Sequence, residues 1–258
     1  MAQVSETVIG FYLNDKRMVI VECFLSDKKI TVLKSAEGDL PNGPISQSNI
    51  NDMTYMQTYC EEILKKLKPQ TNFASINLPP GSYIIKHIPM SRDYIDASPE
   101  LIKWELKHYI LADEDKYLYS HFHINGQSYF LAALKNIVYQ RMTLLKGLGL
   151  VPVAIEPTEI IPYNFAAFAE KNLEKYNTIV FINLSTPYTT ISLFYKGIYY
   201  PGSTLMTDAN LFKSSYKDEV NTEGVGEFIE NLRVQFDFLY GNIAFRLGEK
   251  PIDLLVFT

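Results

Sequence analysis

Polar and titratable side chains gather at a few points of the sequence, and each point suggests a kind of chemistry. His121 and His123 stand two residues apart on a predicted strand, so both imidazoles could face one way and bind a metal ion. No cluster of Cys, Asp or Glu accompanies them, which favours a pair of surface or interface histidines. We therefore predict no metal site.

Other candidate sites are weaker still. The hydroxyl groups at positions 185, 186, 189 and 190 could form a nest for an anion, although threonine is common in strands for packing reasons. The acidic run 113–115 lacks the spacing of an EF-hand and is typical of a solvated turn. The sequence contains no nucleophile elbow, no complete P-loop and no Ser/His/Asp set. It therefore predicts no catalytic residues.

The composition is that of a globular protein: 47% of the 258 residues are hydrophobic and 21% are charged. The net charge of −5 argues against a nucleic-acid-binding protein, which normally presents a basic face. Neither a signal peptide nor an apolar run long enough to span a membrane is present, so we expect a cytoplasmic location without membrane insertion. Cys23 and Cys60 lack CxxC spacing and are expected to be reduced, buried thiols.

One order of elements occurs twice along the chain. Alternating apolar residues and turn signals predict strands at 7–13, 18–24 and 29–33, a helix at 53–67 and a strand at 73–78. The order returns as strands at 178–184, 189–195 and 198–200, a helix at 226–246 and a strand at 252–257. This duplicated unit resembles the way the actin/Hsp70/hexokinase fold is built. RNase H-like nucleases use one such unit and are the alternative for either half.

A different block separates the two copies. It has predicted strands at 83–95, 117–124, 128–134 and 151–155, and helices that begin at Ser98 and Asn136. In the first helix Trp104 lies next to the apolar stripe formed by Ile102, Leu106 and Ile110, and we expect it to be mainly a core residue. On that expectation Trp104→Ala would cost about 3 kcal/mol of stability.

These patterns predict an α/β protein made of two RNase H-like (actin/Hsp70-type) halves and an inserted α+β subdomain. The predicted first half comprises residues 1–82 and 156–176. The inserted strand-helix-strand subdomain comprises residues 83–155, and a shortened second half comprises residues 177–258.

Short apolar motifs support a more specific resemblance. The sequence resembles the PilM/FtsA family of actin-like proteins, which carry such an inserted subdomain, at residues 75–79, 84–89, 102–110, 130–134 and 148–157. The short chain also resembles an uncharacterised family of actin-fold proteins from Bacteroidetes. The resemblance runs in order along most of the chain.

The resemblance implies a nucleotide site between two hairpins, and this sequence departs from it there. The first hairpin of the family reads Gly-Ile-Asp-Ile-Gly, and here Tyr12 replaces the Asp and Asn14 the second Gly. The second hairpin normally reads Asp-Ile-Gly followed by Thr. Here it has Asn183 and Ser185 in place of Asp and Gly, and Thr189 alone matches.

Each replacement weakens the implied chemistry. Glycine lets the backbone amides of a tight turn approach phosphate, and aspartate holds hydrated magnesium better than neutral Asn or Tyr. The segment 200–222 is too short for the family's fourth subdomain, and the sequence ends where the adenosine motif would begin. We therefore expect no nucleotide cofactor and no ATPase activity. An RNase H-type nuclease is disfavoured as well, because Tyr12 and Asn183 supply no carboxylates.

The predicted function is a cytoplasmic, non-catalytic scaffold that binds a protein or peptide, in the way the resemblance implies for PilM and a membrane partner. The cytoplasmic tail of a membrane protein is one possible partner. A nucleotide-binding actin-like ATPase or switch with a divergent site is the alternative. A small-molecule carrier is a third possibility without a positive signal.

Overall fold

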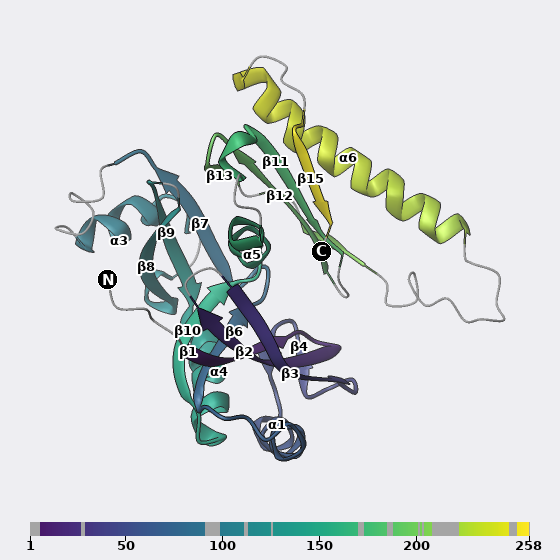
Figure 1. The fold of residues 1–258 in the computed structure, drawn as a ribbon. Coiled ribbons are helices and arrows are strands. Elements are labelled where there is room, and N and C mark those ends of the chain that lie inside the picture. Colours follow the sequence, from purple (N-terminus) through teal and green to yellow (C-terminus); the bar gives the residue numbers. More distant parts are fainter. Residues whose placement is uncertain are drawn as a thin grey trace.

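The computed structural model describes residues 6–26, 29–90, 99–110, 113–124, 126–169, 173–184, 188–200, 202, 204–207, 222–247 and 252–257. Its strands and helices form two lobes, with a further small sheet beside the first lobe (Figure 1). Mixed sheets covered by helices place the protein in the predicted α/β class.

The first lobe is built on a five-stranded sheet with the order β10-β6-β1-β2-β3. Strands β1, β2 and β3 form an antiparallel meander, while β6 runs parallel to β1 and β10 parallel to β6. The strands are β1 (Glu6–Leu13), β2 (Arg17–Ser26), β3 (Lys29–Asp39), β6 (Phe73–Leu78) and β10 (Val151–Pro157). A two-residue pair, β4 (Ile45–Ser46) and β5 (Asn49–Ile50), lies beside this sheet.

Two helices, α1 (Met53–Leu67) and α4 (Lys135–Gly147), pack on one face of this sheet. The Asp52 carboxylate accepts a hydrogen bond from the backbone N–H of Tyr55 and caps the start of α1. Lys68 adopts a left-handed conformation that ends the helix before Pro69. The apolar stripe of α1 is buried against strand residues such as Ile9 and Met18, as its three- and four-residue spacing predicts.

The second lobe repeats the order in a five-stranded sheet that contains the path β13-β12-β11-β15, in which β15 runs parallel to β11. The short strand β14 also pairs with β12. The elements are β11 (Thr178–Asn183), β12 (Tyr188–Tyr195), β13 (Ile198–Tyr200), β14 (Thr204–Met206), α6 (Thr222–Leu247) and β15 (Leu254–Phe257). Helix α6 packs on one face of the sheet through Leu232, Phe236 and Leu239. The duplicated unit expected from the sequence is thus present.

Helix α5 (Ile161–Ala169) lies between the two lobes (Figure 1). It begins three residues after the predicted start at 156–158, because β10 extends through Pro157 and a turn follows. Tyr163 of α5 stacks on Phe194 of the second lobe, with ring centroids 3.8 Å apart. By chain order α5 follows the first lobe, but its apolar side packs on the sheet of the second.

The inserted sheet has the order β7-β9-β8 and is flanked by α3. Its elements are β7 (Tyr83–Ile88), α3 (Pro99–Lys107), β8 (Tyr117–Ile124) and β9 (Gln127–Leu134), with short 3-10 turns at Glu114–Lys116 and, further along, at Leu173–Lys175. The predicted boundary at residue 155 needs correction, because β10 is part of the first-lobe sheet and α4 packs on α1. A local apolar pattern does not say which sheet a strand joins.

Trp104 is not a core residue, contrary to the prediction. Its side chain is 60% exposed and makes an edge contact with His108, while Leu106 and Ile110 are buried. The reason is helical geometry, since residues two apart on a helix lie about 200° apart around its axis. The predicted cap Ser98 lies outside the described residues. Among the described helices, none is both long and apolar enough to cross a membrane.

Candidate functional site

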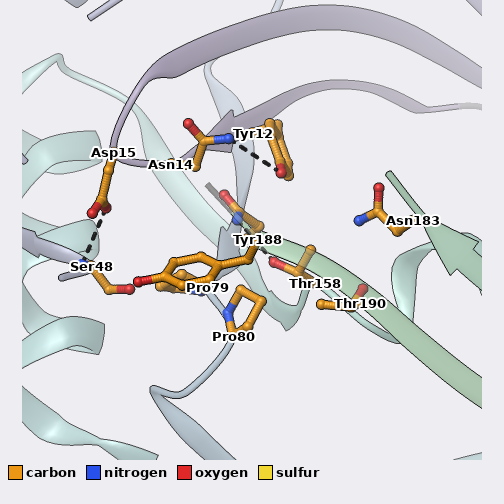
Figure 2. A pocket seen from close by; sticks show the side chains of 11 residues that line it. Tyr12, Asn14, Asp15, Ser48, Pro79, Pro80, Thr158, Asn183, Tyr188 and Thr190 are labelled. Carbon is orange, nitrogen blue, oxygen red and sulfur yellow. Dashed lines mark hydrogen bonds between the residues drawn. The ribbon is translucent and has the colours of Figure 1, made fainter. Parts of the chain in front are cut away.

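The ends of both hairpins meet in a cleft between the lobes (Figure 2). Tyr12, Asn14 and Asp15 come from the first hairpin, and Asn183, Tyr188 and Thr190 come from the second. The space that these residues enclose together is about 10 Å³, roughly that of one water molecule. A wider depression of about 380 Å³ adjoins it, because Tyr12, Thr158 and Asn183 line both. The two hairpins are thus brought together.

Asn14 uses its side chain to close its own turn. The Oδ1 atom accepts hydrogen bonds from the backbone N–H groups of Lys16 (2.9 Å) and Arg17 (2.8 Å), which is the geometry that makes Asn frequent in turns. Its Nδ2 atom donates to the hydroxyl of Tyr12 over 3.5 Å, as Figure 2 shows. Asn14 is therefore a turn-forming residue in this fold.

Asp15 places a carboxylate where backbone amides point into the cleft. Gln47 and Ser48 have φ angles of 48° and 69°, so two successive non-glycine residues adopt the left-handed conformation. Their N–H groups donate to Asp15 Oδ2 (2.9 Å) and Oδ1 (3.2 Å). Successive amides of this kind form an anion-binding nest, and here the anion is the protein's own carboxylate.

Asn77, at the end of β6, joins three strand ends. Its Oδ1 accepts from the backbone N–H of Leu13 (2.7 Å), and its Nδ2 donates to Leu13 O (3.3 Å) and to Thr158 Oγ1 (3.0 Å). The Thr158 hydroxyl donates in turn to the carbonyl of Leu78 (2.6 Å). These bonds consume the amide and hydroxyl groups at the carboxyl ends of β1, β6 and β10.

Arg141 of α4 lies beneath this network and is fully buried. Its Nε donates to the carbonyl of Asn77 (2.9 Å) and its Nη1 to the carbonyl of Ser48 (3.2 Å), while Nη2 has no hydrogen-bond partner among the described residues. Burial lowers the pKa of the guanidinium to about 10, and the negative charge of Asp15 acts in the opposite direction. The floor of the cleft thus holds one cation and one anion of its own.

The second hairpin contributes differently from the prediction. Thr190 lines the cleft, whereas the neighbouring Thr189 faces away and pairs its hydroxyl with that of Thr207 at 2.8 Å. Tyr188 reaches from the second lobe across Pro79 toward Ser48 (Figure 2). Ser185 lies outside the described residues.

Sequence reasoning missed Asp15, Asn77, Thr158, Arg141 and Tyr188. Asn77 is the second-last residue of β6 and Thr158 directly follows β10, and a polar residue at the end of a strand was the available signal. Asp15 resembles any polar turn residue until the fold brings the segment 47–48 against it. A buried Arg on an amphipathic helix has no local signature, because its partners are carbonyls 64 and 93 residues away.

A second polar cluster joins both lobes and the inserted sheet. Tyr199 of β13 donates its backbone N–H to the Tyr129 hydroxyl (2.6 Å) and its own hydroxyl to Glu159 Oε2 (2.7 Å). Burial raises the pKa of the Glu159 carboxyl, against the opposing effect of hydrogen bonds from Tyr199 and Tyr83. Burial also raises the pKa of Tyr129 to about 12. The cluster therefore favours neutral side chains at the junction.

The pair of histidines considered for a metal lies on β8. Their rings contact edge to face at 5.4 Å, and His123 Nδ1 lies 3.0 Å from Ser128 Oγ. In the described part of the chain, no three His, Cys, Asp or Glu residues are grouped so that they could hold a metal ion.

The fold is similar to that of solved actin-like proteins. Against PilM in the PilM–PilN type IV pilus biogenesis complex the TM-score is 0.69, with 16% identity over 97% of this chain and 81% of that chain. A Bacteroides thetaiotaomicron protein with an actin-like ATPase fold and unknown function gives 0.51, with 7% identity over 98% and 90% of the two chains. The ethanolamine utilization protein EutJ from Carboxydothermus hydrogenoformans gives 0.48, with 12% identity over 98% and 76%.

No known protein family and no curated protein matches the sequence. The structural likeness confirms the predicted resemblance at the level of fold: this is a PilM-like actin fold with two related lobes. At these identities the likeness carries no information on activity.

Proposed function

We propose that this chain is a non-catalytic actin-fold scaffold that works in the cytoplasm by binding another protein. The observation that carries the proposal is the cleft, where several polar groups already bind one another. The backbone nest holds Asp15, Asn77 ties the strand ends together, and the hairpin positions discussed for magnesium are Tyr12 and Asn183. A nucleotide whose phosphates entered between the hairpins would have to displace these contacts.

A protein partner is supported by the structural neighbour. PilM is found in a complex with PilN in type IV pilus biogenesis, so this type of fold can present a protein-binding surface. We extend to the present chain only the class of partner, a protein segment, with the tail of a membrane protein as one form. The alternative is a nucleotide-binding actin-like ATPase or switch with a divergent site.

The deciding experiment is thermal unfolding of the full chain with 1 mM ATP and MgCl₂. Tight binding must stabilise the native state, by about 2.7 kcal/mol at a ligand concentration one hundred times Kd. We expect no shift of Tm. A shift of several degrees that Asn183→Ala abolishes, and that the matched exposed control Asn231→Ala retains, would establish the switch instead.

A second experiment tests for the protein partner itself. It asks which proteins co-purify with the full chain before and after nucleotide is removed with apyrase and EDTA. The scaffold proposal expects a partner that stays bound in both conditions. Loss of the partner on nucleotide removal would contradict it.

A further inference from the structure

The sheet of the first lobe has one covered face and one open face. The burial of β1 and β2 alternates: Ile9 and Ile20 are buried under α1, while Val8, Val19 and Val21 point the other way. Those three side chains join none of the buried clusters formed by the described residues. An apolar sheet face normally packs on another layer, whereas no helix or sheet among the described residues covers these half-buried side chains.

The second lobe shows what covers the equivalent face. Its central strands β11 and β12 are buried along both faces, one against α6 and the other against α5. Helix α5 occupies the face opposite α6 by placing Tyr163 against Phe181 and Phe194, and Ile160, just before the helix, joins the same cluster. Since the two lobes repeat one order of elements, the open face of the first lobe corresponds to the face that α5 covers in the second.

The open face is also hollowed. A depression of about 300 Å³ is floored by Gly10 and Ser75, walled by Val19 and Val21, and bounded by Ile161. A second depression of about 380 Å³ continues from it toward the hairpin cleft, because Tyr12 and Ile161 line both depressions and Thr158 and Asn183 also line the cleft. Phe165 of α5, which is 60% exposed, lines this second depression as well. Together they run along the sheet and beside α5.

The shape of this surface selects the kind of occupant. An extended strand binds at a sheet edge, where backbone groups are free, whereas a sheet face offers only side chains. A helix satisfies its own backbone, and a helix, α5, is what covers the equivalent face of the second lobe, so we take a helix as the occupant. Glu156 is the charged residue in these depressions, so a basic residue on the flank of the helix would be complementary.

We propose that the open face of the first-lobe sheet is a docking site for an amphipathic helix of another protein. The helix has an aliphatic face about as long as the nine-residue α5 and a Lys or Arg near Glu156. It comes from another polypeptide because the long helices of this chain, α1, α4 and α6, already bury their main apolar faces in its own cores. This inference rests on the proposed scaffold function and names the chemistry of its partner.

The test uses a native cysteine at the margin of the open face as the attachment point for a photo-cross-linker. Cys23 follows Val21 on the same side of β2, whereas Cys60 is fully buried with its pKa raised to about 12 by burial. Benzophenone-maleimide should therefore attach at Cys23, and irradiation in extract of the source cells should cross-link a neighbouring protein. Mass spectrometry then identifies the attached segment.

Gly10→Leu is the diagnostic variant. A Cβ at position 10 meets nothing closer than 3.9 Å, and the rest of a Leu side chain would extend into the depression that Gly10 lines. Provided that Gly10→Leu melts like the wild type, it should lower the cross-link yield about tenfold. Gly226→Leu, at an open position on α6, is the matched control and should leave the yield unchanged. Gly10→Ala should give an intermediate loss, and it replaces the larger variant if that one melts early.

Support requires an attached segment with helical apolar spacing, together with loss of the cross-link in Gly10→Leu. An extended segment, a yield insensitive to Gly10→Leu, or attachment to a second copy of this chain would overturn the docking proposal. So would a partner that co-purifies but does not cross-link. In each of these cases the scaffold function stands or falls separately, because it requires only that some protein partner co-purifies.

Discussion

The two lobes repeat one order of elements, but they differ in how their sheets are covered. In the second lobe β11 and β12 are buried on both faces, and Phe181 and Phe194 lie under α5. In the first lobe β1 and β2 are buried on one face only, and Val19 and Val21 line an open depression. The helix α5 therefore covers one face of the sheet in the lobe that follows it in sequence, and the sheet of the lobe that precedes it lacks such a cover among the described residues.

The largest effect expected from this comparison is the loss of an aromatic ring under α5. Phe194 is 1% exposed, so Phe194→Ala should lower the free energy of unfolding by about 3–5 kcal/mol. Val21→Ala on the open face should cost about 1 kcal/mol or less. Urea denaturation of both variants measures the two values. Similar losses at the two sites would mean that the first-lobe sheet is covered after all.

A smaller, pH-dependent effect is expected where the lobes are joined. Because burial raises the pKa of Glu159, the folded state binds its proton more tightly than the unfolded state does. Its contribution to stability is fully present below the unfolded pKa and is lost as the pH rises through the folded pKa. Glutamine does not ionise, so Glu159→Gln does not lose this contribution. The Tm of the variant relative to that of the wild type should therefore rise between pH 4 and pH 7.

Glu156→Gln is the control for this experiment, since that carboxylate is exposed only three residues away. Its Tm difference from the wild type should stay constant over the same pH range. If the Tm difference of Glu159→Gln is also constant, burial does not raise the pKa of Glu159 in the folded state.

The smallest effect is expected outside both lobes. Trp104→Ala should change the free energy of unfolding by less than about 0.5 kcal/mol, because its side chain is mostly in water. Leu106→Ala on the buried side of α3 should cost about 2–5 kcal/mol. The same urea titration compares them. A large drop in the free energy of unfolding of Trp104→Ala would mean that Trp104 is a core residue, as the sequence predicted.

Much of the fold could be predicted from periodicity. The strands of both hairpins, α1 with its end before Pro69, and the repeated order follow from alternating or helical apolar spacing and from turn residues. Pairing between distant strands could not be predicted in this way. The pattern at 151–155 indicates a strand, but only the fold places β10 beside β6.

The sequence predicted where the candidate site lies better than it predicted which contacts its residues make. The hairpin residues Tyr12, Asn14 and Asn183 do meet, because hairpins at equivalent places in a repeat face each other. The roles of Asp15 and Arg141 depend on backbone groups far along the chain, which no local pattern encodes. Thr189 was misplaced relative to Thr190 because strand alternation decides which of two neighbours faces a cleft.

The position of α5 has a consequence for how the protein is made. A ribosome synthesises α5 before any strand of the second lobe, so Tyr163 and its neighbours are present when β11 and β12 emerge. The nascent sheet then condenses on an apolar surface that already exists. Conversely, a fragment that begins at residue 177 would expose Phe181 and Phe194 to water, and we expect it to aggregate instead of folding on its own.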